Sequence, residues 1–363
     1  NSTDWGTASN WTMGIPGTGT LDNNVTFATN ANNNNRPAVK NLVLDIDRTI
    51  NKYENNTAFD LIIPTEKQLT INGTVTDANA LGGTIIVQAD KDKATGTLIL
   101  NPDSVTNVGA TVQFYNKAYT CNDCGTPNPQ QWQYFGIPVK TINSFPYTTG
   151  NPETIFEWSE AAFGDKWITP STPLAAFRGY EINNSTLSAH NINPLTTIYN
   201  FAGTLNVGDA TVPLTYTSSV NYKGWNLIGN SYTAAIPIAT AISYSGGWNS
   251  TVYLFNAGSR NSWRKLTGNT EWGLESGRYV SVPLNTAGSG GLPSIIPSMH
   301  AFMIETTSAG NLTLDYSKLT KNALVEGANG SSIVWRSASS QPTELPFIVM
   351  DVIGTESADR VWL

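Results

Sequence analysis

The sequence predicts an all-β protein of several domains, on three observations. Only 13% of its 363 residues are Asp, Glu, Lys or Arg, against roughly 25% in a typical soluble domain. The 31 glycines and 19 prolines favour turns over helix interiors. Short runs of alternating apolar and polar residues recur along the chain, as strands with one buried face require. We therefore expect almost no helix.

Residues 1–35 predict an N-terminal cap segment. They are rich in Asn, Thr and Gly, and runs such as "ATNANNNN" cannot form a core. Two tryptophans, Trp5 and Trp11, lie in this segment. Because large aromatic side chains usually become buried, we expect these two to pin the segment to the domain that follows.

Residues 36–120 predict a short N-terminal β-solenoid. Strand-like runs follow one another at intervals of roughly 15 to 20 residues, separated by turn residues. The runs are "NLVLDID", "DLIIPTEKQLTINGTV", "GTIIVQAD", "GTLILN" and "ATVQFY". Repeated strand-turn units with irregular spacing are typical of a solenoid. A flat meander of hairpins is the alternative.

Residues 125–220 and 221–320 contain a degenerate internal repeat. "QQWQYFGIP" matches "KGWNLIGNS" 93 positions later, so that Trp132 corresponds to Trp225 and Gly136 to Gly229. "TIFEW" matches "TVYLF" at an offset of 97, and "RGYEI" matches "HAFMI" at an offset of 122. The second copy therefore carries an insertion before its final strand. We expect two related antiparallel β-sandwiches, jelly-roll-like in arrangement.

Residues 321–363 predict a partial C-terminal β-unit. Three runs read as strands, "SIVWRSAS", "LPFIVMDVIG" and "ADRVWL". The last run stops on Trp362 and Leu363 without a turn, so we expect a truncated chain, a proteolytic end, or a strand completed by missing chain. An open strand also predicts self-assembly by strand pairing with another chain.

Several stretches resemble large surface proteins of Bacteroidetes and follow the order found there. They are "NWTMGIPGTGTLDNNVTFA", "WQYFGIPV", "NFAGTLNVGDATVPLTYT", "GWNLIGNSYTAAI" and "IIPSMHAFMI". Ser231 departs from the family pattern, which often has Pro there. Such proteins are typically exported by the type IX secretion route. The resemblance implies a non-catalytic, adhesin-like protein that is extracellular or on the outer cell surface. A carbohydrate-binding accessory region of a larger secreted enzyme and a subunit of a surface filament or layer are the alternatives.

The charge pattern argues against nucleic acid as a partner. The net charge is −7, and the sequence has no cluster of Lys and Arg, which phosphate-backbone binding needs. No run of about 18 apolar residues predicts a membrane span. We therefore expect a glycan or a protein at a surface as the partner.

The stretch "NLVLDIDRTI" resembles the nucleophile motif of haloacid dehalogenase-type phosphotransferases. That reading needs a helix after the strand, and it needs Gly where Arg48 stands. The sequence that follows is β and turn, so we interpret Asp45 and Asp47 as the solvated face of one strand whose other face holds Leu42, Leu44 and Ile46. Two carboxylates two positions apart also make a candidate surface cation site, with calcium as the possible ion.

The two cysteines, Cys121 and Cys124, predict a small disulfide in a loop. A redox Cys-x-x-Cys pair normally opens a helix, and two prolines follow here instead. The carboxylates Glu157, Glu160 and Asp165 cluster in one segment. Because Glu157 corresponds to Leu254 in the second copy, we interpret this cluster as a solvated face rather than a catalytic pair. We predict no catalytic residue and no cofactor.

The insertion of the second copy is the candidate ligand-binding loop. Trp272, Arg278 and Tyr279 lie there among Gly, Ser, Thr and Asn. Exposed loop aromatics stack on sugar rings or fill pockets of a partner. Packing of these rings over the end of the sandwich is the alternative.

Overall fold

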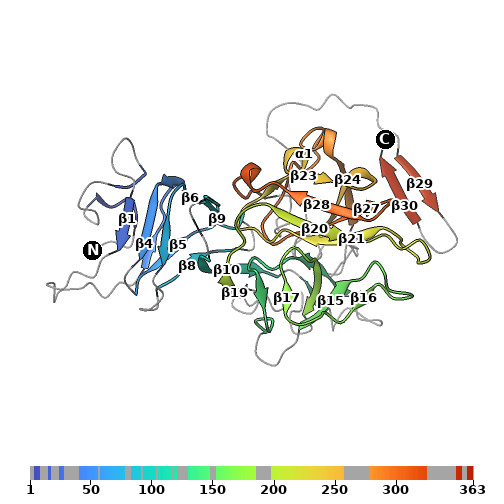
Figure 1. The fold of residues 1–363 in the computed structure, drawn as a ribbon, viewed down its shortest axis with the longest axis horizontal. Coiled ribbons are helices and arrows are strands. Elements are labelled where there is room, and N and C mark those ends of the chain that lie inside the picture. Colours follow the sequence, from blue (N-terminus) through green and yellow to red (C-terminus); the bar gives the residue numbers. More distant parts are fainter. Residues whose placement is uncertain are drawn as a thin grey trace, which may run out of the picture. The chain divides into compact units, whose positions relative to one another are not determined.

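Strands make up nearly all the regular structure of the computed structural model (Figure 1). It describes residues 4–8, 15–17, 24–27, 41–55, 58–77, 83–90, 93–103, 105, 107–116, 118–120, 130–147, 153–184, 198–256, 278–324, 349–353 and 358–362. Within these ranges, helix is limited to α1 (Ile238–Ala241) and to 3-10 turns, including η5 (Leu284–Thr286) and η6 (Tyr316–Lys318). The predicted all-β class is therefore confirmed. The chain divides into two compact units, Asn1–Ile333 and Val334–Leu363.

The N-terminal part is built from successive coils of parallel strands. The first coil holds β2 (Asn41–Val43), β3 (Arg48–Ile50) and β4 (Lys52–Asn55), and the second holds β5 (Asp60–Ile63), β6 (Gln68–Ile71) and β7 (Val75–Asp77). The third holds β8 (Ile85–Val87) and β9 (Thr97–Leu100), and β10 (Gly109–Tyr115) follows. Equivalent strands pair in parallel, in the orders β2-β5-β8-β10, β3-β6-β9 and β4-β7.

The alternation of inward-facing and outward-facing residues within each strand explains how the coils stack. Leu42 lies opposite Leu61, and Leu61 lies opposite Ile85. All three side chains are buried, because every second residue of a strand points to the same face. Their stacking fills the inside of the coils with aliphatic side chains.

The stretch Asn41–Ile50 is not the single strand that the alternation predicts. The chain leaves β2 after Val43 and turns a corner before β3 begins at Arg48. Leu42 and Leu44 are buried as expected, whereas Ile46 is 51% exposed and Arg48 is buried. The corner interrupts the two-residue period, so the face assignment fails after Leu44.

The N-terminal segment covers the open edges of the first coil. β1 (Asn24–Phe27) pairs in parallel with β4. Asp4 forms a parallel bridge with Val43, and the Trp5 amide donates to the Val43 carbonyl at 2.9 Å. The Trp5 ring is fully buried, while Trp11 lies outside the described residues.

A strand from the first repeat joins the sheet of the coils. β19 (Ile198–Thr204) pairs antiparallel with β10 over seven residue pairs. One hydrophobic cluster extends from Trp5 through the coils to Phe135, Tyr180 and Phe201. The coils and the first repeat therefore share a continuous core.

Two four-stranded antiparallel sheets have the same strand order. The first is β13 (Gln133–Phe135), β18 (Tyr180–Asn184), β15 (Glu153–Trp158) and β16 (Trp167–Ile168). The second is β21 (Trp225–Gly229), β27 (Ala301–Thr306), β24 (Trp248–Asn256) and β25 (Arg278–Pro283). Gln133 pairs with Ile182 in the first, and Asn226 pairs with Ile304 in the second. These pairs are related by the offsets of 93 and 122 positions found in the sequence.

Small sheets complete the first unit, and a hairpin forms the second. The small sheets are β20 (Ala210–Leu214), β28 (Gly310–Leu314) and β23 (Ile242–Tyr244); β22 (Ile236–Pro237) and β26 (Ile295–Ile296); β14 (Thr141–Ile142) and β17 (Leu174–Ala175); and β11 (Tyr119–Thr120) and β12 (Gln130–Gln131). In the second unit, β29 (Val349–Ile353) pairs antiparallel with β30 (Ala358–Trp362). The predicted strand in "SIVWRSAS" lies outside the described residues.

Candidate functional site

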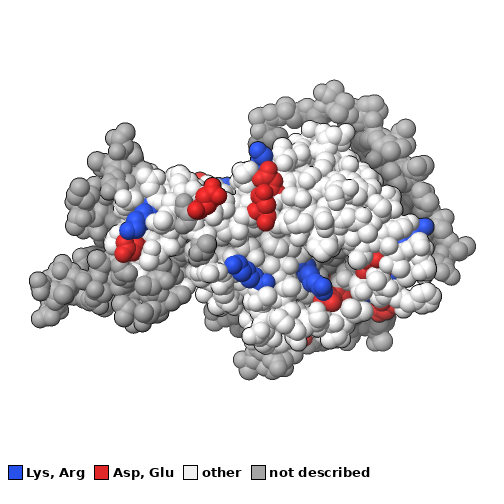
Figure 2. Space-filling model, viewed as in Figure 1, with Lys and Arg blue, Asp and Glu red and all other residues white. Residues whose placement is uncertain are grey.

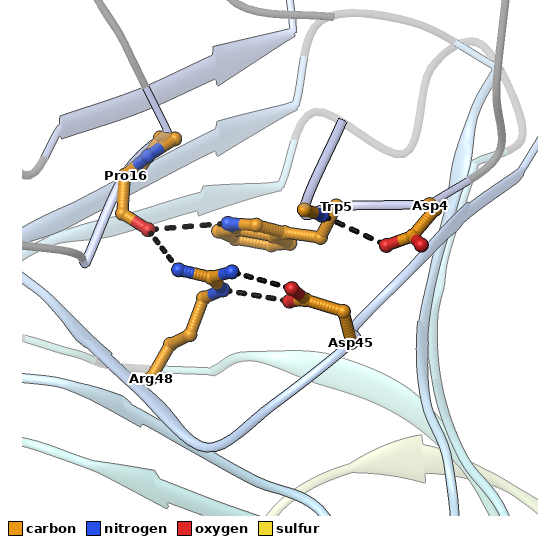
Figure 3. A network of polar contacts seen from close by, with 6 residues as sticks. Asp4, Trp5, Pro16, Asp45 and Arg48 are labelled. Carbon is orange, nitrogen blue, oxygen red and sulfur yellow. Dashed lines mark hydrogen bonds and ion pairs between the residues drawn. The ribbon is translucent and has the colours of Figure 1, made fainter. Parts of the chain in front are cut away.

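Asp45 belongs to a polar network that fixes the N-terminal segment on the first coil (Figure 3). Arg48 donates to both carboxylate oxygens of Asp45, from Nε at 2.8 Å and from Nη2 at 2.6 Å. Arg48 Nη1 and Trp5 Nε1 both donate to the Pro16 carbonyl, at 3.1 and 3.2 Å. Burial would raise the pKa of Asp45, but the hydrogen bonds and the charge of Arg48 lower it overall. Asp45 therefore anchors a buried arginine.

Asp47 binds two other segments. Within the described chain it makes no contact with the Asp45 network. Its Oδ1 accepts from the Gln68 amide at 2.8 Å, and its Oδ2 pairs with Lys321 Nζ at 2.6 Å. Across the described residues, no three His, Cys, Asp or Glu side chains are grouped so as to hold a metal. The candidate cation site at Asp45 and Asp47 stays a prediction, and both carboxylates have protein partners.

The "GWNLIGNS" stretch that carries the family resemblance has a structural role. Asn226 accepts from the Thr215 amide at 3.1 Å and donates to the Thr215 and Gly224 carbonyls, each at 2.9 Å. Gly224 has a φ of +77°, a region that favours glycine. Asn226 therefore ties the end of one strand to the start of the next.

Asn230 organises the loop after β21 in the same way. Its Nδ2 donates to the carbonyls of Ala234, Ile296 and Pro297 at 2.9 to 3.0 Å, and its Oδ1 accepts from the Tyr232 amide at 3.0 Å. Asn230 is fully buried. A side chain whose polar atoms are satisfied by backbone groups has no capacity left for a ligand.

The two copies meet at their equivalent glycines. A Cβ added to Gly136 would lie 2.6 Å from Gly229 Cα. The Gly136 amide donates to the Met299 carbonyl at 3.0 Å, and the Gly229 amide donates to the Phe177 carbonyl at 3.4 Å. Phe177 and Met299 are themselves equivalent in the repeat, and their φ values are +61° and +60°. The contact is therefore pseudo-symmetric, and only glycine allows this approach.

Aromatic rings fill the layer between the two four-stranded sheets. Tyr134 stacks on Phe255 with centroids 4.4 Å apart, and it contacts Trp167 at 5.3 Å. Trp158 contacts Trp167 at 5.2 Å and donates from Nε1 to the Trp225 carbonyl at 2.6 Å. The motif tryptophans also pack within the protein, Trp132 on Phe156 at 5.7 Å and Trp225 on Tyr253 at 4.7 Å, as large aromatics usually do.

Tyr279, the one predicted ligand residue whose side chain is described, lies at the rim of this aromatic layer. It is 45% exposed, and its ring contacts Phe255 at 5.3 Å. Its hydroxyl lies 2.8 Å from the Tyr134 hydroxyl. Burial, first of all, raises the pKa of Tyr279 to about 12. Trp272, the side chain of Arg278, and both cysteines, Cys121 and Cys124, lie outside what the structure describes.

Glu181 is a residue that sequence reasoning missed. It lies on β18 directly opposite Tyr134 and is only 6% exposed. Burial, with a contribution from the Asp165 carboxylate, raises the pKa of Glu181 to about 8. The equivalent residue in the second copy is Met303, which faces the same layer. A comparison of the two repeats at this position would have revealed the buried acid.

Among the carboxylates of residues 157–165, only Asp165 lies on a solvated face, which corrects the prediction. Glu157 and Glu160 are both buried. Glu160 accepts from the amides of Thr217 and Gly224 at 2.7 and 2.8 Å. Burial would raise the pKa of Glu160, but these hydrogen bonds lower it overall. The sequence could not show this, because the donating amides lie some sixty residues away in the chain.

Charged side chains are sparse on the surface. On the face drawn in Figure 2 they stand singly or in small groups among uncharged residues. No helix in the described ranges has the length and hydropathy to cross a membrane.

These features define an all-β protein whose recognisable motifs are structural. A family model described as "Domain of unknown function (DUF8693)" matches residues 1–363, and the chain belongs to this family. Over 371 aligned positions it is 46% identical to the minor fimbrium subunit Mfa5 of Porphyromonas gingivalis. The match covers 99% of this chain and 29% of the relative, so the chain spans less than a third of that protein's length. No solved structure matches.

The comparison bears on the predicted location. A fimbrium is a surface appendage, and the relative comes from a Bacteroidetes species, as the motifs suggested. The extracellular or outer-surface location is therefore confirmed.

Proposed function

We propose that this chain is part of a non-catalytic, structural subunit of a cell-surface filament. The observation that carries this proposal is the 46% identity, over 99% of the chain, to a protein named as a minor fimbrium subunit. That relative is much longer, so its role is extended to this chain as a proposal. The family motifs are rich in structural hydrogen bonds, which supports a role as a structural component rather than as a reactive site.

Within this proposal the coils of parallel strands form a β-solenoid stalk. Residues 1–35 act as its cap, residues 125–220 and 221–320 as two related sandwiches, and residues 321–363 as a partial C-terminal unit. Continuous ladders of main-chain hydrogen bonds suit a stiff element. Because the surface has few charges, salt should not weaken this element. We propose type IX secretion as the export route.

Antibodies against this chain test the proposal on intact cells. We expect immunogold particles along surface filaments, peptides of the chain in sheared and purified filaments, and altered filaments after deletion of the gene. Gold confined to the cell body, together with purified filaments free of the chain, would refute the filament role.

A second candidate function is adhesion through exposed aromatic side chains. Tyr279 is 45% exposed and Phe163 is 89% exposed, and Trp272 and Arg278 belong to the same candidate set as Tyr279. Binding of the purified protein to a glycan array, lost in Trp272→Ala and Tyr279→Ala, would favour an adhesin or a carbohydrate-binding accessory region. If no glycan on the array binds the protein, the structural role stands without an adhesive one.

A further inference from the structure

Glu181 is a carboxyl group without a counterpart in the second repeat. Its position in the second copy is occupied by Met303, with the same register in the same kind of sheet. Burying a carboxyl group without a hydrogen bond destabilises a protein. In the described chain no hydrogen bond or ion pair reaches the Glu181 side chain, although it is 6% exposed. Such a group points to a role outside folding.

An aromatic ring, that of Tyr134, lies beside this carboxyl group, and further rings contact Tyr134. Tyr134 lies directly opposite Glu181 on the neighbouring strand, and directly opposed side chains share one face of a sheet. Tyr134 contacts Trp167 at 5.3 Å and Tyr279 at 6.2 Å. Tyr279 is 45% exposed, so this group of rings reaches the surface.

A second carboxylate stands beside the same group. Asp165 is exposed, and its Oδ1 accepts from the Trp167 amide at 3.0 Å. After burial, the larger cause, its charge also contributes to the raised pKa of Glu181. The hairpin that holds Asp165 is fixed, because Lys166 Nζ donates to the carbonyls of Glu160 and Ala162 at 2.6 and 2.8 Å.

We propose that Glu181, Asp165, Trp167, Tyr134 and Tyr279 form a binding site for an organic cation, an ammonium or guanidinium group. Ring faces attract cations through their quadrupole, and aromatic cages recognise ammonium groups in this way. Asp165 supplies an opposite charge, and Glu181 adds a second one once it has lost its proton. The cation would come from a Lys or Arg side chain of a partner protein or from a free polyamine, and both sources share this chemistry.

The site is independent of the proposed filament role. A filament subunit without this site remains a filament subunit, and the cation site could exist in a protein that never enters a filament. Its test therefore uses the purified chain alone.

The test is a titration of the full chain with acetyl-Gly-Lys-Gly-amide, followed by intrinsic tryptophan fluorescence. The matched neutral control is the same peptide with norleucine, and spermidine is the second cation. We expect saturable binding of the lysine peptide and none of the norleucine peptide. A stronger response to spermidine than to the peptide would assign the site to free polyamines, and the reverse to a partner's side chain.

Two variants separate the site from the fold. Glu181→Met places in the first copy the residue that the second copy already carries, so it keeps the fold while removing binding. Glu181→Gln keeps the shape and should weaken binding about tenfold. In the wild type, affinity should rise roughly tenfold between pH 6.5 and 8.5 as Glu181 loses its proton, and this rise should vanish in Glu181→Gln.

Three results would overturn the proposal. They are equal binding of the lysine and norleucine peptides, unchanged binding by Glu181→Met, and binding of neutral sugars without binding of either cation. Circular dichroism confirms that Glu181→Met is folded before its binding is compared with that of the wild type.

Discussion

Asn322 ties together segments that are far apart in the chain. It is 3% exposed. Its Nδ2 donates to the carbonyls of Gly96 and Thr233 at 3.1 and 3.3 Å, and its Oδ1 accepts from the Ser298 amide at 2.9 Å. Its own amide donates to Thr97 Oγ1 at 2.9 Å. One side chain thus joins the third coil to the second repeat.

Replacing Asn322 with Ala should lower the free energy of unfolding by about 2–4 kcal/mol, because it leaves buried backbone groups without partners. Urea denaturation measures the change. Asn101→Ala is the control: Asn101 also donates to a carbonyl, that of Asn72 at 2.6 Å, but at an exposed position, and should change stability by less than about 1 kcal/mol. Equal effects of the two variants would contradict the linking role.

Glu181 should make the protein less stable as the pH rises. The folded protein keeps this proton up to about pH 8, whereas the unfolded chain loses it near pH 4.5. Folding therefore takes up a proton between these values, and the free energy of unfolding falls through that window. Glu181→Met should be more stable than the wild type at pH 8.5, by about 1–3 kcal/mol, with a smaller difference at pH 5. Thermal melts at both pH values measure this, and a difference independent of pH would contradict it.

Single residues were predictable where composition or local pattern decides their environment. Burial of Trp5 and partial burial of the repeat tryptophans follow from their size and apolar neighbours. Glu181 was missed although its counterpart in the second repeat, Met303, marks the position as buried. Glu160 and Asn322 were not predicted, because their environments come from strands or loops distant in the chain. A charged residue in a polar stretch gives no local sign that tertiary contacts will bury it.

Close approach of two backbones at Gly229 holds the two repeats together. A Cβ at this position would lie 2.5 Å from the Arg178 carbonyl oxygen and 2.6 Å from Gly136 Cα. Gly229→Ala should therefore lower stability by about 1–3 kcal/mol through overpacking. In the control Gly290→Ala, a Cβ meets nothing within 4 Å at a φ of +58°, so only backbone strain of about 1 kcal/mol remains. Guanidinium melts compare the two, and a Gly229 variant no worse than the control would contradict the close contact.

Strands were predictable from alternation, and corners were not. The runs from "NLVLDID" to "ATVQFY" each contain observed strands, because apolar alternation marks a half-buried strand whatever its partners. The bend between Val43 and Arg48 has no signal in the sequence, because Asp45 and Asp47 continue the alternation of apolar and polar residues. Only the burial of Arg48 in the structure shows that the chain turned. The equivalence of the two repeat sheets was visible from sequence because Trp, Gly and apolar positions recur at fixed offsets.

Continuity of the core links the coils to the rest of the first unit. Solenoids usually behave as quasi-one-dimensional stacks that can unfold from an end. Here one hydrophobic cluster runs from Trp5 to Met299, and Leu98 exchanges hydrogen bonds with Thr233 of the second repeat. The coils therefore cannot lose their structure without exposing core residues of the repeats.

The first unit should accordingly unfold in one cooperative transition, even when the first coil is weakened. Arg48→Met removes the buried ion pair with Asp45 and the hydrogen bond to the Pro16 carbonyl, and should lower the free energy of unfolding by about 3 kcal/mol. Lys52→Met is the control, because its pair with Glu54 is more exposed and such pairs contribute little. Calorimetry should show the whole main transition moving to lower temperature in Arg48→Met, with near-ultraviolet circular dichroism of the aromatic layer following it. An early separate transition that leaves the aromatic signal unchanged would mean that the coils unfold on their own.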